Sequence, residues 1–214
     1  MPLQNRVTPT GEIVADPGRG LLMGNRGCLH GPSRELGITR WRSKLWICCV
    51  LKWKNVKRDV MPPGRWTALF FLDEATAFAA GHRPCAYCRR QDYLAYAFAW
   101  AGARGLADRP YAAEMDAILH QQRVVSHNRR QKTHTVRARA LPDGVMIRHE
   151  GQPALLLGGA ALPWSFAGYG DPVRPRTTVE VLTPRASVDA IAAGYRPWLH
   201  PSAKAEHTLR VLPG

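Results

Sequence analysis

The chain has 214 residues, of which 45% are hydrophobic and 21% are charged. This composition excludes a largely disordered chain, and the length allows one large domain or two small ones. No stretch approaches the roughly 20 apolar residues that a membrane-spanning helix needs, and the first residues lack the apolar core of a signal peptide. We therefore expect a cytoplasmic protein that does not interact with membranes.

Positive charge is the strongest compositional signal. The chain carries 30 Lys and Arg against 16 Asp and Glu, a formal net charge of +14, and both halves are basic. A folded surface with this excess favours a polyanionic partner, so we expect nucleic acid, with DNA favoured over RNA. A genome-wide bias towards arginine is the alternative, and it would fit a small-molecule enzyme that binds no nucleic acid.

The first 60 residues are expected to form loops and one hairpin. Residues 1–30 are rich in Gly and Pro, whereas residues 40–60 predict a basic β-hairpin around the apolar run from Leu45 to Leu51. Cys48 and Cys49 lie inside this run. They are therefore predicted to be core residues.

A strand and three helices are expected next. The strand covers Trp66 to Leu72, and Asp73 then has the short acceptor side chain that caps a helix ending at Gly81. Apolar spacing predicts further helices from Arg90 to Ala103 and from Ala112 to about Val124.

The C-terminal half is expected to be richer in strands. Residues 178–182 alternate as a strand does, and a short helix is expected over residues 187–193. We predict an α+β chain with a basic β-hairpin and short helices in its N-terminal half and a β-rich C-terminal half. The expected division is residues 1–105 and 106–214, either as two regions or as one continuous domain.

Cys85 and Cys88 form a C-x-x-C motif between two predicted helices. Two thiolates at this spacing can bind one zinc ion while backbone N–H groups hydrogen-bond the sulfurs. A redox pair is the alternative, but such a pair normally follows a strand in a βαβ unit, whereas a helix precedes this one. The odd number of cysteines also argues against a disulfide framework.

Residues 71–89 resemble the second half of the zinc-binding domain of the Ada methylphosphotriester-repair family. That family has a strand, a short helix ending in Ala-Gly, and an R-P-C-x-x-C motif that supplies the last two of four zinc cysteines. The resemblance implies that Cys85 and Cys88 are zinc ligands and that zinc stabilises the N-terminal half.

The upstream ligands of that family, a C-x-x-x-C pair, have no direct counterpart here. Cys28 and His30 are the candidates, which would give a Cys3His site with Cys85 and Cys88, and His82 is the rival fourth ligand. In the Ada family a zinc-bound cysteine of the first pair accepts a methyl group from a DNA phosphotriester. Cys28 is the position that could match it.

A second possible reaction centre lies in the helix expected after residue 112. Asp116 and His120 are four residues apart and therefore share one helix face, to which Arg123 also belongs. An Asp–His pair would orient an imidazole for general base catalysis. A surface ion pair on an amphipathic helix is the alternative.

Basic residues from two parts of the chain are expected to contact phosphates, including those of the stretch 127–134. These residues are Arg26, Arg40, Arg42, Lys44, Arg129, Arg130 and Lys132. The sequence thus predicts a zinc-containing nucleic-acid-binding protein linked to DNA repair or modification. The alternative is a nuclease, a glycosylase or an alkyl-transfer repair protein that uses Asp116 and His120 or a zinc-bound Cys28.

Overall fold

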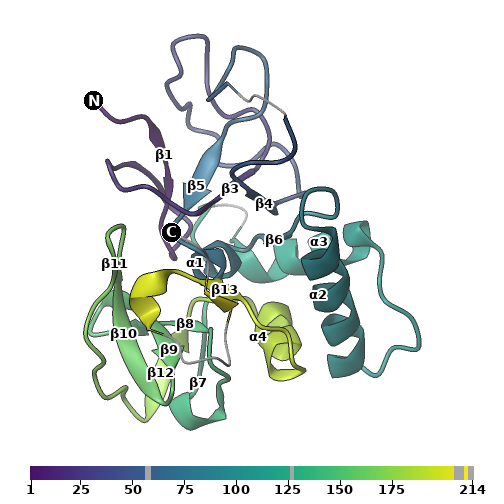
Figure 1. Cartoon of the computed structure of the whole chain (residues 1–214), viewed down its shortest axis with the longest axis vertical. Coiled ribbons are helices and arrows are strands. Elements are labelled where there is room, and N and C mark those ends of the chain that lie inside the picture. Colours follow the sequence, from purple (N-terminus) through teal and green to yellow (C-terminus); the bar gives the residue numbers. More distant parts are fainter. Residues whose placement is uncertain (56–58, 126–127, 205–209, 212–214) are drawn as a thin grey trace.

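The computed structural model describes residues 1–55, 59–125, 128–204 and 210–211. In these residues the chain forms two six-stranded sheets and four α-helices (Figure 1). The predicted α+β class is confirmed. No helix in the described ranges is long and apolar enough to cross a membrane.

The first sheet is built from the N-terminal part of the chain and has the order β2-β1-β5-β3-β4-β6. The pairs β1–β5 and β4–β6 are parallel, and the other neighbours are antiparallel. Its strands are β1 (Gln4–Val7), β2 (Ile13–Ala15), β3 (Leu22–Asn25), β4 (Ile47–Val50), β5 (Leu69–Phe71) and β6 (Arg83–Pro84).

The hairpin predicted within residues 40–60 is wrong, although its apolar run does form a strand. That strand, β4, pairs antiparallel with β3 and parallel with β6. β4 lies inside the sheet, because strands from elsewhere in the chain pair with both of its edges, and its Cys48 is fully buried. The residues of β4 themselves predict a strand, but they do not specify which other strands pair with it.

The second sheet is antiparallel, is built from residues 134–181 and has the order β11-β10-β9-β8-β12-β7. Its strands are β7 (His134–Arg137), β8 (Met146–His149), β9 (Gln152–Leu157), β10 (Ala160–Ser165), β11 (Gly168–Tyr169) and β12 (Thr178–Val181). A separate parallel pair joins β13 (Trp198–Leu199) to β14 (Arg210–Val211).

The helices lie where the sequence predicts them. They are α1 (Glu74–Ala79), α2 (Arg90–Ala103), α3 (Ala112–Arg123) and α4 (Arg185–Ala192), with short 3-10 turns η1 (Ala138–Ala140) and η2 (Pro201–Ala203). Asp73 caps α1 by accepting from Thr76 N at 2.9 Å, and Gly81 follows it with φ +84°, which confirms the predicted ends. α2 packs on α4 beside the second sheet (Figure 1).

Every residue of α1 is buried, because the helix lies between the two sheets (Figure 1). Phe78 belongs to the largest apolar cluster, which also contains Trp100 of α2 and Val181 of β12. Other faces of α1 contribute to two further clusters, through Ala75 and Ala77. The core therefore joins residues from both sides of position 105.

The start of α1 holds two buried carboxylates that anchor the C-terminal segment. Tyr169 donates its hydroxyl to Asp73 Oδ2 at 2.7 Å, and Tyr195 donates to Glu74 Oε1 at 2.9 Å. Arg89 forms an ion pair with Glu74 at 2.7 Å. Burial raises the pKa of Asp73, while the hydrogen bonds it accepts act in the opposite direction.

Candidate functional site

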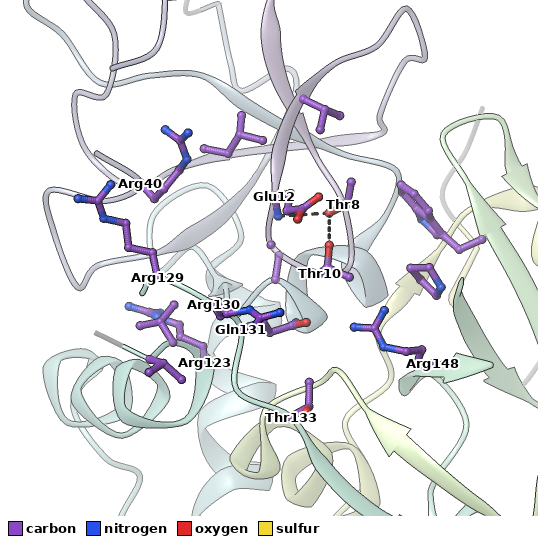
Figure 2. A pocket seen from close by; sticks show the side chains of 18 of the residues that line it. Thr8, Thr10, Glu12, Arg40, Arg123, Arg129, Arg130, Gln131, Thr133 and Arg148 are labelled. Carbon is purple, nitrogen blue, oxygen red and sulfur yellow. Dashed lines mark hydrogen bonds between the residues drawn. The ribbon is translucent and has the colours of Figure 1, made fainter. Parts of the chain in front are cut away.

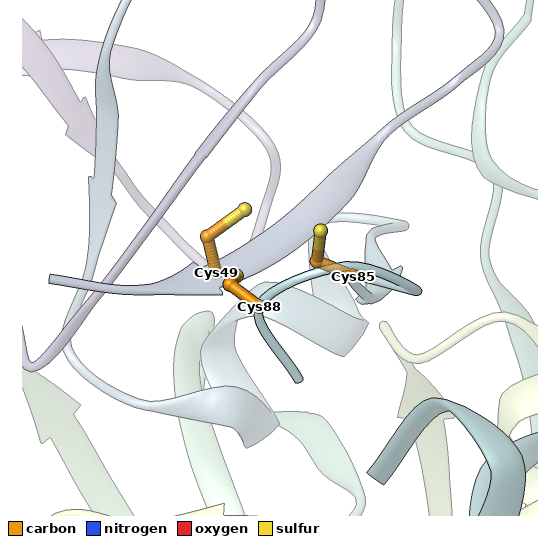
Figure 3. Close-up of side chains that lie close together, drawn as sticks. All are labelled: Cys49, Cys85 and Cys88. Atoms are coloured by element: carbon orange, nitrogen blue, oxygen red, sulfur yellow. The ribbon is translucent and has the colours of Figure 1, made fainter. Parts of the chain in front are cut away.

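Three thiols come together where β4 lies beside β6 (Figure 3). The parallel register pairs Cys48 with Pro84, so Cys49 is the neighbour of Cys85, and the turn before α2 returns Cys88 to the same place. The three Sγ atoms lie within 4.8 Å of one another. Among the described residues, this is the one group of three or more Cys, His, Asp or Glu side chains close enough to hold a metal ion.

Hydrogen bonds within the group favour one thiolate. The pKa of Cys85 is lowered, first by the thiol of Cys49 and then by that of Cys88, while the pKa of Cys49 is raised by the same contacts. Tyr87 N also lies 3.4 Å from Cys85 Sγ and donates to it. The group therefore combines a stabilised sulfur anion with two further thiols, which suits a cation that binds sulfur.

The geometry fits a tetrahedral zinc ion with three protein ligands. Zinc–sulfur bonds of about 2.3 Å place the sulfurs of a tetrahedral site about 3.8 Å apart, a separation compatible with three Sγ atoms that lie within 4.8 Å of one another. Cys85 and Cys88 are buried and Cys49 is half-buried. These thiols would hold the metal, and a fourth ligand would complete its shell.

Cys49 is the member that the sequence analysis missed, because it was predicted to be a core residue. Consecutive strand residues point to opposite faces, so Cys48 enters the core while Cys49 faces the turn before α2. The adjacent cysteine pair was the available signal. It could not be used without knowing that β4 pairs with β6.

The predicted upstream ligands lie outside this group. Both ring nitrogens of His30 have other partners, Nδ1 with Thr67 Oγ1 at 2.7 Å and Nε2 with Pro62 O at 3.2 Å. Cys28 Sγ lies 3.7 Å from the carbonyl oxygen of His30, to which it donates. The structure thus brings together Cys85 and Cys88 with Cys49, and leaves Cys28 and His30 in a separate loop.

His82, the rival ligand, is fully buried in an aromatic setting. Its ring lies 4.6 Å from that of Phe71 and 5.2 Å from that of Trp46, between centroids. Arg26 Nε donates to His82 Nε2 at 3.4 Å. Burial lowers the pKa of His82, and Arg26 lowers it further, so the ring is neutral.

The second feature is a basic cleft with a volume of about 1360 Å³, between the β1–β2 turn, the chain that follows α3, and the second sheet. Figure 2 shows Arg40, Arg123, Arg129 and Arg130 towards one side and Arg148 on the other. The arginines that line the cleft are Arg26, Arg40, Arg123, Arg129, Arg130 and Arg148, against the acidic residues Glu12, Asp16 and Glu180.

The cleft gathers four of the predicted phosphate contacts, Arg26, Arg40, Arg129 and Arg130. The remaining three are exposed side chains outside its lining: Arg42, Lys44 and Lys132. In the predicted basic stretch 127–134, residue 127 lies outside the described residues.

The predicted Asp116–His120 pair is not formed, which corrects the expectation for α3. Arg83 instead binds both oxygens of Asp116, at 2.9 Å from Nε and 2.7 Å from Nη2. His120 Nδ1 accepts from Arg123 Nη2 at 3.1 Å. A planar guanidinium satisfies both carboxylate oxygens at once, so Asp116 pairs with Arg83 and does not orient the imidazole of His120.

Comparisons of the chain with protein-family models, with curated proteins and with solved structures found no match. The fold and the thiol group define an α+β protein with three cysteines that could hold a metal ion.

Proposed function

We propose that this chain is a zinc-containing protein that binds nucleic acid in the basic cleft. The observation that carries the proposal is the convergence of arginines from separate parts of the chain on one cleft. Arg26 and Arg40 come from the N-terminal sheet region, and Arg129 and Arg130 follow α3. Such a concentration of guanidinium groups suits a phosphate backbone.

Zinc has a structural role in this proposal. A metal bound by Cys49, Cys85 and Cys88 would tie β4 to the turn that starts α2. The same turn leads into Arg89, which pairs with Glu74 at the start of the central helix. Metal binding would therefore stabilise the position of α1, whose C-cap residue Ala80 lines the cleft.

The experiment is fluorescence anisotropy of a labelled oligonucleotide at increasing salt concentration. Affinity should fall steeply between about 50 mM and about 200 mM salt, because each neutralised phosphate releases counterions. The double variant Arg129→Gln/Arg130→Gln should weaken binding and reduce the salt slope by about one for each lost contact.

Arg139→Gln is the matched control, since Arg139 is an exposed arginine of η1 that does not line the cleft. It removes one charge without touching the proposed interface, and should leave the affinity nearly unchanged. The comparison that matches it in charge is the single variant Arg129→Gln. Equal losses of affinity in these two single variants would indicate a general charge effect and count against the cleft. Absence of salt-sensitive binding in the unmodified protein would refute the proposal.

Alkyl transfer from DNA is a second candidate, favoured by Cys49. It rests on the resemblance of residues 71–89 to the Ada family and on a third thiol supplied by the strand upstream, so Cys49 replaces Cys28 as candidate acceptor. Metal binding would deprotonate Cys49, whose pKa is otherwise raised, and its thiolate would attack the methyl carbon of a phosphotriester. The methyl carbon–oxygen bond would break, and a phosphodiester anion would leave. Mass spectrometry after incubation with methylphosphotriester DNA tests this, because only transfer leaves a methyl group on Cys49.

A further inference from the structure

Two arginines at the inner wall of the cleft are buried almost completely. Arg26 and Arg123 each expose 2% of their surface, although both line the cleft. Their guanidinium carbons lie 4.0 Å and 3.8 Å from the centroid of the Trp46 ring, which is itself buried. One indole ring thus holds two positive groups at the same wall.

Neither arginine has a carboxylate partner within 4.0 Å in the described part of the chain. Arg26 donates to the carbonyls of Gly11 at 2.9 Å and Ala80 at 3.4 Å, and Arg123 donates to those of Gly81 and Lys44 at 2.8 Å and 2.7 Å. Arg123 Nε is buried and has no hydrogen-bond partner. Neutral carbonyl groups satisfy some of the donors but do not neutralise the two charges.

The other two fully buried arginines of the described chain show how this protein normally treats such a charge. Arg83 is paired with Asp116 at 2.7 Å, and Arg89 is paired with Glu74 at 2.7 Å. Burying an unpaired charge costs free energy, so arginines are rarely buried without an anion. The two exceptions to pairing are the two that line the cleft.

The pKa values of Arg26 and Arg123 also reflect two buried positive charges that lack a paired carboxylate. Burial lowers the pKa of Arg26 to about 9, with a further contribution from Arg40, and burial and Arg26 together lower the pKa of Arg123 to about 9. Positive groups that repel one another in a desolvated wall would be stabilised by a bound anion.

We propose that Arg26 and Arg123 form a pocket for a phosphomonoester, which on the proposed function is the terminal phosphate of a nucleic-acid strand. A dianion matches two guanidinium charges, whereas an internal phosphodiester carries one. A monoester also has a substituent on one side only, so it can reach a wall that is 2% exposed. Arg40, half-buried in the same lining, would contact the next phosphate outward.

A purely structural role for the pair makes a different prediction. Ala80 and Gly81 end the segment of α1, and their carbonyls carry the negative end of that short helix, which two cations stabilise. If this were the whole role, added phosphate would have no effect beyond that of ionic strength.

The first measurement uses inorganic phosphate on the unmodified protein, read as a thermal shift against chloride at equal ionic strength. Binding to the folded state raises Tm as the phosphate concentration passes Kd. The rise should be lost in Arg123→Gln and kept in Arg139→Gln, whose exposed side chain does not line the cleft. Arg123→Lys keeps the positive charge but loses the planar guanidinium that can donate two parallel hydrogen bonds, and it should bind phosphate about tenfold more weakly.

The second measurement compares oligonucleotides with and without a 5′- or 3′-terminal phosphate. Tighter binding of a phosphorylated strand by about tenfold, lost in Arg123→Gln, would support the pocket and assign its source to nucleic-acid ends. A phosphate-induced Tm rise with no such preference would assign the pocket to a free phosphomonoester. Salt-sensitive oligonucleotide binding without any phosphate-specific Tm rise would refute the pocket but not the proposed function. A phosphate-specific Tm rise without salt-sensitive oligonucleotide binding would refute only the proposed function.

Discussion

Arg83 and Asp116 form a buried ion pair with two parallel hydrogen bonds, of 2.9 Å and 2.7 Å, between β6 and α3. Burial raises the pKa of Asp116, whereas Arg83 lowers it. The pair joins two segments that are distant in sequence. Its role in this structure is to fix α3, and with it Arg123, against the N-terminal sheet.

Replacing Asp116 with Asn should therefore destabilise the fold strongly. It leaves Arg83 buried without a counter-charge, for which a loss of about 3–5 kcal/mol is expected in urea unfolding. Glu180→Gln is the matched control, because it breaks the Arg148–Glu180 pair of 2.9 Å, whose side chains are about one-third exposed. That change should cost less than about 1 kcal/mol. Equal losses in the two variants would contradict the role assigned to the buried pair.

Metal binding should depend on Cys49 and not on Cys28. We expect about one zinc ion per chain in the purified protein, and loss of that zinc in Cys49→Ser and Cys85→Ser, because three thiolates supply most of the shell. A chelator should then lower Tm of the unmodified protein more than that of Cys49→Ser. Inductively coupled plasma mass spectrometry gives the stoichiometry.

Cys28→Ser provides the control for this prediction. Cys28 is half-buried and donates only to a backbone carbonyl, so its replacement should leave the zinc content unchanged. Loss of zinc in Cys28→Ser with retention in Cys49→Ser would restore the ligand set expected from the sequence. It would also contradict the site derived from the register of β4 and β6.

His120 should remain neutral well below the usual pH range of histidine. Burial lowers its pKa to about 4, helped by Arg123. Between this value and about 6.5 the unfolded chain binds a proton that the folded chain excludes, so this contribution to stability is complete above about pH 6.5 and falls as pH drops through the window. The ring-proton chemical shift in an NMR titration measures the pKa directly.

The corresponding variant is His120→Gln. It should reduce the slope of unfolding free energy against pH between about 4 and about 6.5, because glutamine binds no proton in either the folded or the unfolded state. A midpoint near 6.5 for His120 in the folded protein would show that the ring is not desolvated beside Arg123.

Local elements of this chain could be predicted from sequence because their signals are local. The Asp73 cap, the turn at Gly81 and the helix-forming residues of α2 are each signals carried by a few neighbouring residues. The C-x-x-C spacing was equally informative for Cys85 and Cys88, which the structure places in the thiol group.

Long-range features could not be predicted in the same way. The third thiol depends on the parallel pairing of β4 with β6, and a strand sequence does not specify its partners. Arg26 and Arg123 were expected to behave as surface cations or as members of a helix face, since a sequence does not show that a charge is buried without a counter-charge. The spacing of Asp116 and His120 correctly placed them on one helix, but Arg83 decided the partner of Asp116.

Gly81 should be essential for the position of Arg123. Its φ is +84°, and a Cβ at this position would lie 2.5 Å from Cδ and 2.8 Å from Cβ of Arg123. Gly81→Ala therefore combines backbone strain with displacement of the arginine, and we expect a loss of about 1–3 kcal/mol together with a weaker phosphate response.

Gly105→Ala separates these two effects. Gly105 also has a positive φ, +62°, but a Cβ there would meet nothing within 4 Å. It should show the backbone cost alone, of about 1 kcal/mol, with the phosphate-induced Tm shift unchanged. If Gly81→Ala were no more destabilising than Gly105→Ala and responded to phosphate normally, Arg123 would be free to move. The close packing of Gly81 against Arg123 would then have no part in shaping the inner wall of the cleft.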